Sequence, residues 1–314
     1  MSGAISFSVR FLLGRASLAA GLAALSFAVA SVAWAAPKNW WIHIKNDRVA
    51  DVKTMVSRGI DVNSVNAEGE PAIMQAIKEG AWQVFDLLAA DRRTNVNAQN
   101  RLGETPLMYL AVVGESERAR KLIQRGAEVN RLGWTPLQYA ASRGHLSMVN
   151  LLLANDAHVN APGPDGTTAL MMAAFSGEQP IVQRLLDAGA DPTMQTLQKE
   201  RAADWARKRG FDDLGRKLDA VAERVLAYRD ALRKQANQVV TYGLDSSWGS
   251  SSAAASHQPQ IPAPDLRLDS TTTASGKAAQ TKSAASRNDA VPESSGQGTS
   301  RYFDLKRFDE EVNP

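Results

Sequence analysis

The chain contains no cysteine among its 314 residues. This excludes a disulfide framework, cysteine metal sites, a thiol nucleophile and a lipid-modified N-terminal cysteine. Histidine is scarce too, and the four histidines are His43, His145, His158 and His257. None lies at metal-ligand spacing from another histidine or an acidic residue. We therefore predict neither a metal site nor a cofactor, and assign His145 a structural role at the start of a helix.

Sequence motifs of catalysis are also missing. The chain has no glycine-rich phosphate loop, no nucleophile elbow and no His-Glu-x-x-His motif. Asp61, Asp165 and Asp191 fall in expected turns, where aspartate side chains commonly bond to the backbone. We predict that the protein is not an enzyme, and we assign no catalytic, cofactor-binding or metal-binding residue.

Neither sign of charge dominates the sequence. The chain has 36 basic and 33 acidic residues, and two of the basic ones, Arg10 and Arg15, lie in an N-terminal segment that we expect to be removed. The remaining 34 basic residues nearly balance the 33 acidic ones. Because nucleic-acid binding needs a concentrated basic surface, we predict no nucleic-acid partner.

The first 35 residues have the composition of an export signal. A positive start precedes an apolar stretch over residues 16–32, and Ala33-Trp34-Ala35 supplies small residues where signal peptidase reads them. We place cleavage between Ala35 and Ala36. An uncleaved membrane anchor is the alternative, since the stretch is near the lower length for spanning a bilayer. Cleavage implies a periplasmic protein without stable membrane insertion, with secretion as the alternative.

Two markers recur through the middle of the chain at intervals of 30 to 34 residues. The glycine marker comprises Gly80, Gly114, Gly144, Gly177 and Gly210. The polar marker comprises Asn63, Asn97, Asn130, Asn160 and Thr193. Two independent markers with one mean period are typical of a repeat protein.

The chemistry around the markers predicts two helices per repeat. Residues 105–107 and 135–137 both read Thr-Pro-Leu, and Thr168 begins a third version without the proline. The threonine can cap a helix, the proline suits its first position and the leucine faces the core. The glycine marker then ends this first helix. A leucine-rich second helix follows, and a short extended segment closes the repeat.

With this pattern the chain resembles the ankyrin repeat family, whose units have about 33 residues. Residues 133–160, GWTPLQYAASRGHLSMVNLLLANDAHVN, follow the family pattern almost throughout. The usual histidine after Thr-Pro-Leu is Met108, Gln138 or Met171 here. Because that histidine bonds neighbouring loops, we expect weaker loop contacts. The resemblance implies an all-α ankyrin-repeat solenoid followed by a disordered C-terminal tail.

We assign an ankyrin domain to residues 36–236. Its units are 37–66, 67–100, 101–130, 131–160, 161–195 and 196–236. The two outer units are atypical, as expected where one face must meet water. Trp40 and Trp41 are expected to seal the first unit. A lengthened terminal helix is expected to pack back on the array through apolar residues Val221, Val225, Leu226 and Leu232.

The composition changes after the predicted domain. Residues 237–300 are rich in Ser and Ala with few large apolar residues, so we predict a disordered linker. Residues 301–314 differ because they contain Tyr302, Phe303 and Phe308. This end is either a remnant of the tail or a short docking peptide.

The resemblance implies a partner-binding concave side formed by loop tips and first helices. We expect the residue before each Thr-Pro-Leu, and the two before each marker glycine, to be free of packing. These partner-binding candidates are Lys78, Glu79, Glu104, Val112, Val113, Trp134, Ser142, Arg143, Thr167 and Phe175. Trp134 and Phe175 are candidate interface anchors, or alternatively cover a neighbouring loop. Tyr109 and Tyr139 are expected to be half-buried structural residues.

One interval between polar markers is only 30 residues, from Asn130 to Asn160. Three residues are missing between Asn130 and Trp134, compared with the preceding unit. We predict a shortened hairpin tip over residues 129–134, with Trp134 at its rim.

The leading hypothesis is a monomeric, non-enzymatic module that binds another protein in the bacterial envelope. One alternative is an envelope stress factor that protects a periplasmic enzyme of the oxidative-stress response. Another is a tether that holds one partner on the repeats and a second on residues 301–314.

Overall fold

The computed structural model describes residues 36–245 and 261–269, and every regular element in these ranges is an α-helix. The predicted all-α class is therefore confirmed. None of the described helices is both long enough and apolar enough to span a membrane. The predicted export signal, and the predicted docking peptide with Tyr302, Phe303 and Phe308, lie outside the described residues.

The helices follow one another in pairs, and each predicted unit contains one pair. The first three pairs are α1 (Lys38–Lys45) with α2 (Val49–Ser57), α3 (Ala72–Lys78) with α4 (Trp82–Ala90), and α5 (Pro106–Val113) with α6 (Ser116–Gln124). The others are α7 (Pro136–Ser142) with α8 (Leu146–Leu153), α9 (Ala169–Ser176) with α10 (Gln179–Asp187), and α11 (Ala202–Lys208) with α12 (Asp212–Asp245). Helix α12 runs past the boundary predicted at residue 236.

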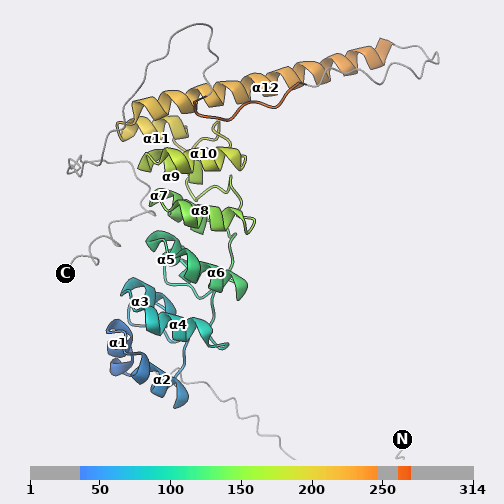
Figure 1. Cartoon of the computed structure of the whole chain (residues 1–314). Helices are drawn as coiled ribbons and strands as arrows, with labels where there is room; N and C mark the ends of the chain where they lie inside the picture. Colours follow the sequence, from blue (N-terminus) through green and yellow to red (C-terminus); the bar gives the residue numbers. More distant parts are fainter. Residues whose placement is uncertain (1–35, 246–260, 270–314) are drawn as a thin grey trace, which may run out of the picture. The chain divides into compact units, whose positions relative to one another are not determined.

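Successive pairs stack so that like helices meet (Figure 1). The first helices pack in the order α1, α3, α5, α7, α9 and α11, while α8 packs between α6 and α10 in the row of second helices. Nearly every residue of α5, α7 and α9 is buried, whereas α6 and α10 bury one face only. The core is therefore one continuous layer between the two rows, as expected when no unit can bury its apolar face alone.

Threonine caps and marker glycines bound the first helices as predicted. The Thr105 and Thr168 hydroxyls accept from the backbone N–H groups of Met108 and Met171, each at 3.4 Å. Gly114 and Gly177 end α5 and α9 with left-handed φ values of 82° and 78°. Only glycine adopts this conformation without steric cost.

The asparagine marker forms a hydrogen-bond ladder between units. Asn97 donates to the carbonyl of Gly126 at 3.0 Å and accepts from the N–H of Glu128 at 2.9 Å. Asn63, Asn130 and Asn160 each make the same pair of bonds to the following loop. An asparagine suits this position because its side chain carries both a donor and an acceptor.

Helix α12 supplies the next step of this ladder. The Arg229 guanidinium donates to Thr193 Oγ1 at 2.8 Å and to Asp191 Oδ2 at 2.6 Å. Burial alone would raise the pKa of Asp191, but hydrogen bonds from Thr193 and Arg229 outweigh it, and the pKa is lowered. Arg229, which has no counterpart in the other units, thus makes the bonds that the loop of a further repeat would have made.

The packing of α12 partly corrects the sequence prediction. Val221 and Val225 are buried as expected. Leu226 and Leu232, in contrast, are 45% and 40% exposed, so they do not pack on the array. Leu232 lies seven residues after Val225, on the same face of α12, but this part of the helix continues beyond the last repeat and has no further unit to pack against (Figure 1).

The loop over residues 129–134 is shortened, as predicted. In each of the other four inter-unit loops, a backbone N–H donates to the carbonyl of the residue four positions later and so closes the hairpin. The accepting carbonyls are those of Glu70, Glu104, Thr167 and Glu200. The loop from Asn130 to Trp134 has no such bond in the described structure. Leu132 at its tip is 97% exposed, so the loop projects into solvent without the hairpin turn.

Residues 261–269, here called the strap, lie within the predicted disordered linker but have a defined path. Arg224 of α12 donates to the backbone carbonyls of Asp265 and Arg267, both at 2.8 Å. Leu268 is only 7% exposed and joins the main core. The prediction of a disordered linker is therefore wrong over residues 261–269. Leu266 and Leu268 order this stretch because they supply the apolar contacts that the surrounding sequence lacks.

Candidate protein-binding surface

Most of the candidates that are partly or fully exposed lie at the C-terminal ends of successive first helices. We define the first-helix surface as Lys78, Glu79, Val113, Trp134, Ser142, Arg143, Phe175 and Arg209. Seven of these residues occupy equivalent end positions on or just after α3, α5, α7, α9 and α11, which pack in that order, and Trp134 lies before α7. The packing therefore places an end position of each unit beside that of the next.

Three sequence candidates do not belong to this surface because they are buried. Glu104, Val112 and Thr167 are 4%, 4% and 0% exposed. The expectation that these positions are free of packing was therefore wrong. Val112 packs with the core, and the carbonyl of Thr167 accepts from Gln138 Nε2 at 2.8 Å.

Glu104 is buried because it holds a tyrosine of the next unit. Its carboxylate accepts from the Tyr139 hydroxyl at 2.7 Å and from Asn100 Nδ2 at 2.9 Å. Glu70 accepts from the Tyr109 hydroxyl at 3.2 Å in the preceding unit. Both tyrosines are buried rather than half-buried, so these Glu–Tyr pairs join units through the core.

Burial raises the pKa of the Tyr139 phenol well above its ordinary value, and Tyr109 nearby adds to the effect. The phenol therefore stays protonated at neutral pH, as it must to donate to Glu104. The sequence signal for these pairs was a glutamate 35 or 39 residues before a tyrosine, but only the structure shows that they meet.

Trp134 is half-buried and packs against the core with its ring on the next loop. A methyl group built onto Gly163 would come within 2.9 Å of the indole ring. The geometry thus matches the alternative interpretation, in which Trp134 covers a neighbouring loop. The remaining exposed part of the ring lies at the rim of the shortened loop.

Phe175 forms an aromatic cluster with two residues that the sequence analysis had not singled out. Its ring meets the Trp205 ring edge-on, with centroids 5.7 Å apart and planes at 67°. The guanidinium of Arg209 lies 4.8 Å from the centre of the Phe175 ring. Such cation–π contacts stabilise a cation over a partly exposed ring by about 0.5–1 kcal/mol.

The three basic residues from Arg207 to Arg209 make different contacts. Arg207 forms ion pairs with Asp204 and Asp219, and Lys208 forms one with Glu200 at 2.5 Å. Arg209, by contrast, is exposed and stacks on Phe175. This leaves Arg209 as the residue of the run that can reach a ligand at the first-helix surface.

Two other side chains have structural roles between units. Gln138 bonds the neighbouring loop, which is the role of the family histidine at this position. Its Nε2 donates to the carbonyls of Ala161 and Thr167 at 3.1 and 2.8 Å. The expectation of weaker loop contacts is wrong at this position. His145 bonds the carbonyl of Val112 at 2.8 Å, which confirms its structural role.

The first-helix surface offers non-covalent contacts. Its central part presents Val113, Trp134 and Phe175, and its cations are Lys78, Arg143 and Arg209. Aromatic and arginine side chains are enriched among the residues that dominate protein interfaces. The described residues contain no group of His, Asp and Glu arranged to bind a metal ion.

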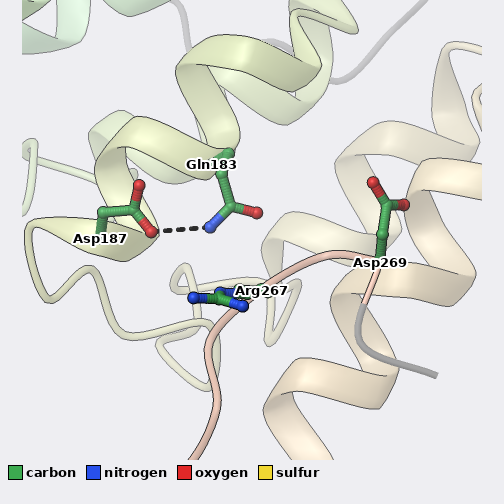
Figure 2. Close-up of a pocket in the computed structure, with 4 residues that line it drawn as sticks. All are labelled: Gln183, Asp187, Arg267 and Asp269. Atoms are coloured by element: carbon green, nitrogen blue, oxygen red, sulfur yellow. Dashed lines mark hydrogen bonds between the residues drawn. The ribbon is translucent and has the colours of Figure 1, made fainter. Parts of the chain in front are cut away.

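A shallow pocket lies away from this surface, between α10 and the strap (Figure 2). It is lined by Gln183, Asp187, Arg267 and Asp269. Gln183 donates to Asp187 at 2.8 Å, so part of its polar lining is already satisfied. The pocket is therefore part of the contact between α10 and the strap.

Comparison with known proteins agrees with this architecture. A family model described as ankyrin repeats matches residues 40–132 and 120–196. A crystal structure of an ankyrin repeat domain from Acinetobacter baumannii AYE is 29% identical, with a TM-score of 0.51. That match covers 59% of this chain and 97% of the bacterial domain.

Curated relatives share the repeats over part of their length. The E3 ubiquitin-protein ligase XBAT33 of Arabidopsis thaliana is 31% identical over 146 residues, covering 46% of this chain and 28% of the ligase. Ankyrin repeat and SAM domain-containing protein 6 of Rattus norvegicus is 33% identical over 134 residues, covering 43% of this chain and 12% of that protein. The chain thus spans less than a third of either relative.

The repeat period, the paired helices and the family match agree. Ankyrin repeats generally mediate protein–protein interaction, and the fold is typically a non-enzymatic module. The chain belongs to the ankyrin repeat family.

Proposed function

We propose that the protein binds another protein through the first-helix surface, in the periplasm of a bacterium. The cluster of Phe175, Trp205 and Arg209 carries this proposal. It combines a partly exposed aromatic ring with a cation already held over it, so little side-chain freedom is lost when a partner docks. Trp205 itself is 8% exposed and holds Phe175 from below.

The location rests on the N-terminal sequence. An apolar stretch with a positive start and small residues at the cleavage site supports export, and the absence of cysteine agrees with it. Fractionation of cells that express the full chain should recover the protein in the periplasmic fraction. Its mass should correspond to an N-terminus at Ala36. Recovery of the uncleaved chain in the membrane fraction would support the anchor instead.

Binding is tested by capture from a periplasmic extract with the purified protein. Arg209→Glu should reduce the recovery of the captured partner about tenfold, because it reverses the charge over Phe175 without disturbing the core. Lys121→Ala, an exposed change on α6 in the row of second helices, is the matched control and should leave capture unchanged. Equal capture by both variants would remove the first-helix surface from the proposal.

A further inference from the structure

We propose that residues 301–314 occupy the first-helix surface of the same chain and compete there with the protein partner. The inference rests on the proposed function for the identity of the surface. It differs from a tether to a second partner, because the occupant and the surface belong to one molecule. Three observations support it: the strap, the length of the linker, and the matching chemistry of segment and surface.

The strap fixes the point from which the end of the chain departs. Leu268 N–H donates to Gln183 Oε1 at 2.9 Å, and Asp269 pairs with Lys217 Nζ at 2.9 Å. The bond to Asp269 raises the pKa of Lys217, which keeps that ammonium charged. The described strap therefore ends at Asp269, beside α10 and α12 and next to the last units of the array.

The linker is long enough to reach the first-helix surface. Residues 270–300 number 31 and are rich in Ser, Thr, Ala and Gly. A random coil of this length has an end-to-end distance of about 30 Å. Packed helices lie about 8–10 Å apart, so the three steps from α11 to α5 also span about 30 Å. The span of the linker therefore matches the extent of the surface.

The strap shortens the connection to the array. Without it, segment 301–314 would be joined to the end of α12 by the 55 residues from 246 to 300. Effective concentration falls as about the −3/2 power of linker length, so the strap raises it about twofold. Linkers in this range give effective concentrations of the order of millimolar, which even a weak peptide contact can use.

The segment is complementary to the surface in chemistry. Its sequence RYFDLKRFDEEVNP places an acidic run, residues 309–311, directly after Phe308. The surface offers Phe175 with Arg209 stacked above it. An aromatic ring beside Phe175 would bring the acidic run to Arg209, where charge-assisted hydrogen bonds can form. The three basic residues of the segment precede Phe308 and can face Glu79 or solvent.

The test is a titration of the full-length protein with a fluorescein-labelled synthetic peptide of residues 301–314. In the unmodified chain the surface is already occupied, so the peptide should bind weakly. Phe303→Ala with Phe308→Ala in the chain should free the surface and tighten peptide binding about tenfold, as expected for millimolar competition in cis. Gln297→Ala with Thr299→Ala, in the linker, is the matched control and should behave as the unmodified chain.

A further substitution assigns the peptide to the surface. Arg209→Glu, added to the Phe303→Ala and Phe308→Ala chain, should abolish the gained binding while the helical circular dichroism stays unchanged. Equal peptide affinity for the unmodified and the opened chain would overturn the proposal. So would light scattering that shows dimers of the unmodified chain but not of the opened chain, since the occupant would then be a second copy.

Failure of this inference and failure of the proposed function are distinguishable. The titration uses no partner protein, so a negative result there leaves capture from the periplasmic extract unaffected. If both hold, the Phe303→Ala and Phe308→Ala chain should capture more partner than the unmodified chain. If capture fails while the titration succeeds, the surface serves the chain's own segment and the proposed function falls.

Discussion

Units in the middle of the array hold one another through contacts that recur, whereas the C-terminal end uses contacts that occur once. Asn63, Asn97, Asn130 and Asn160 each bond the following loop in the same way. At Thr193 the following unit offers no such loop, and Arg229 of α12 makes the bond instead. The difference shows how a repeat array ends: side chains from a non-repeated element satisfy the groups that another unit would have bonded.

This difference predicts that a cavity made in the middle of the array lowers the free energy of unfolding more than one made at its C-terminal end. Leu110→Ala in α5 empties a fully buried site between α3 and α7 and should lower the free energy of unfolding by about 3 kcal/mol. Leu268→Ala in the strap should cost about 1 kcal/mol, because only the strap needs to relax. Urea denaturation followed by circular dichroism measures both. A larger loss for Leu268→Ala would contradict the distinction.

Next in size is the Glu–Tyr pair that joins the middle units. Tyr139→Phe leaves Glu104 without its bond of 2.7 Å and should cost about 2 kcal/mol. The folded-state pKa of Tyr139 is raised, so its contribution is present below the unfolded pKa of about 10 and is lost as pH rises further. The unfolding free energy of the unmodified chain should therefore fall above about pH 10 more steeply than that of Tyr139→Phe. Identical slopes would count against the pair.

The arginine at the end of the ladder should matter less than the asparagines. Arg229→Ala removes two bonds from a side chain that is 42% exposed, and should cost about 0.5–1 kcal/mol. Its effect should begin to shrink as pH falls below the ordinary aspartate pKa of about 4, and should be lost as pH falls through the lowered pKa of Asp191, because the unfolded chain binds this proton more readily than the folded chain. Asn97→Ala, which removes a donor and an acceptor at once, is the comparison. Thermal melts of both variants at two pH values measure these losses. A larger loss for Arg229→Ala than for Asn97→Ala would contradict the prediction.

The smallest effect is expected at the shortened loop. Inserting Ala-Gln-Asn after Asn130 restores the residues that the preceding unit has at 98–100. Since Leu132 is 97% exposed, the insertion should change stability by less than about 0.5 kcal/mol. A loss above about 2 kcal/mol would mean that the shortened loop supports the packing of Trp134 on Gly163.

Sequence reasoning succeeded where the physics is local and repeated. Thr-Pro-Leu predicts a capped helix, and the glycine after Val113 predicts its end, because caps depend on a few neighbouring residues. The interval of 30 residues also predicted the loop at 129–134, since a deletion from a repeat can be located by comparison with its neighbours.

Contacts between units were predicted less well because they depend on residues more than 30 positions apart. A glutamate before Thr-Pro-Leu reads as an exposed charge, yet Glu104 lies under Tyr139 of the next unit. The strap could not be foreseen either, since Leu266 and Leu268 pack on a core formed by residues far earlier in the chain. Phe175 was identified as an anchor, but its partner Arg209 belongs to the following unit.

The central claim is that a partner protein docks on the first-helix surface. Placing a photo-crosslinking amino acid at Val113, an exposed residue of this surface, leaves Arg209 in place, and irradiating intact cells that contain this full chain tests the claim most directly. The account predicts a discrete adduct with another protein from position 113 and none from the exposed position Lys121 on α6. Adducts from Lys121 alone, or none from position 113, would contradict it.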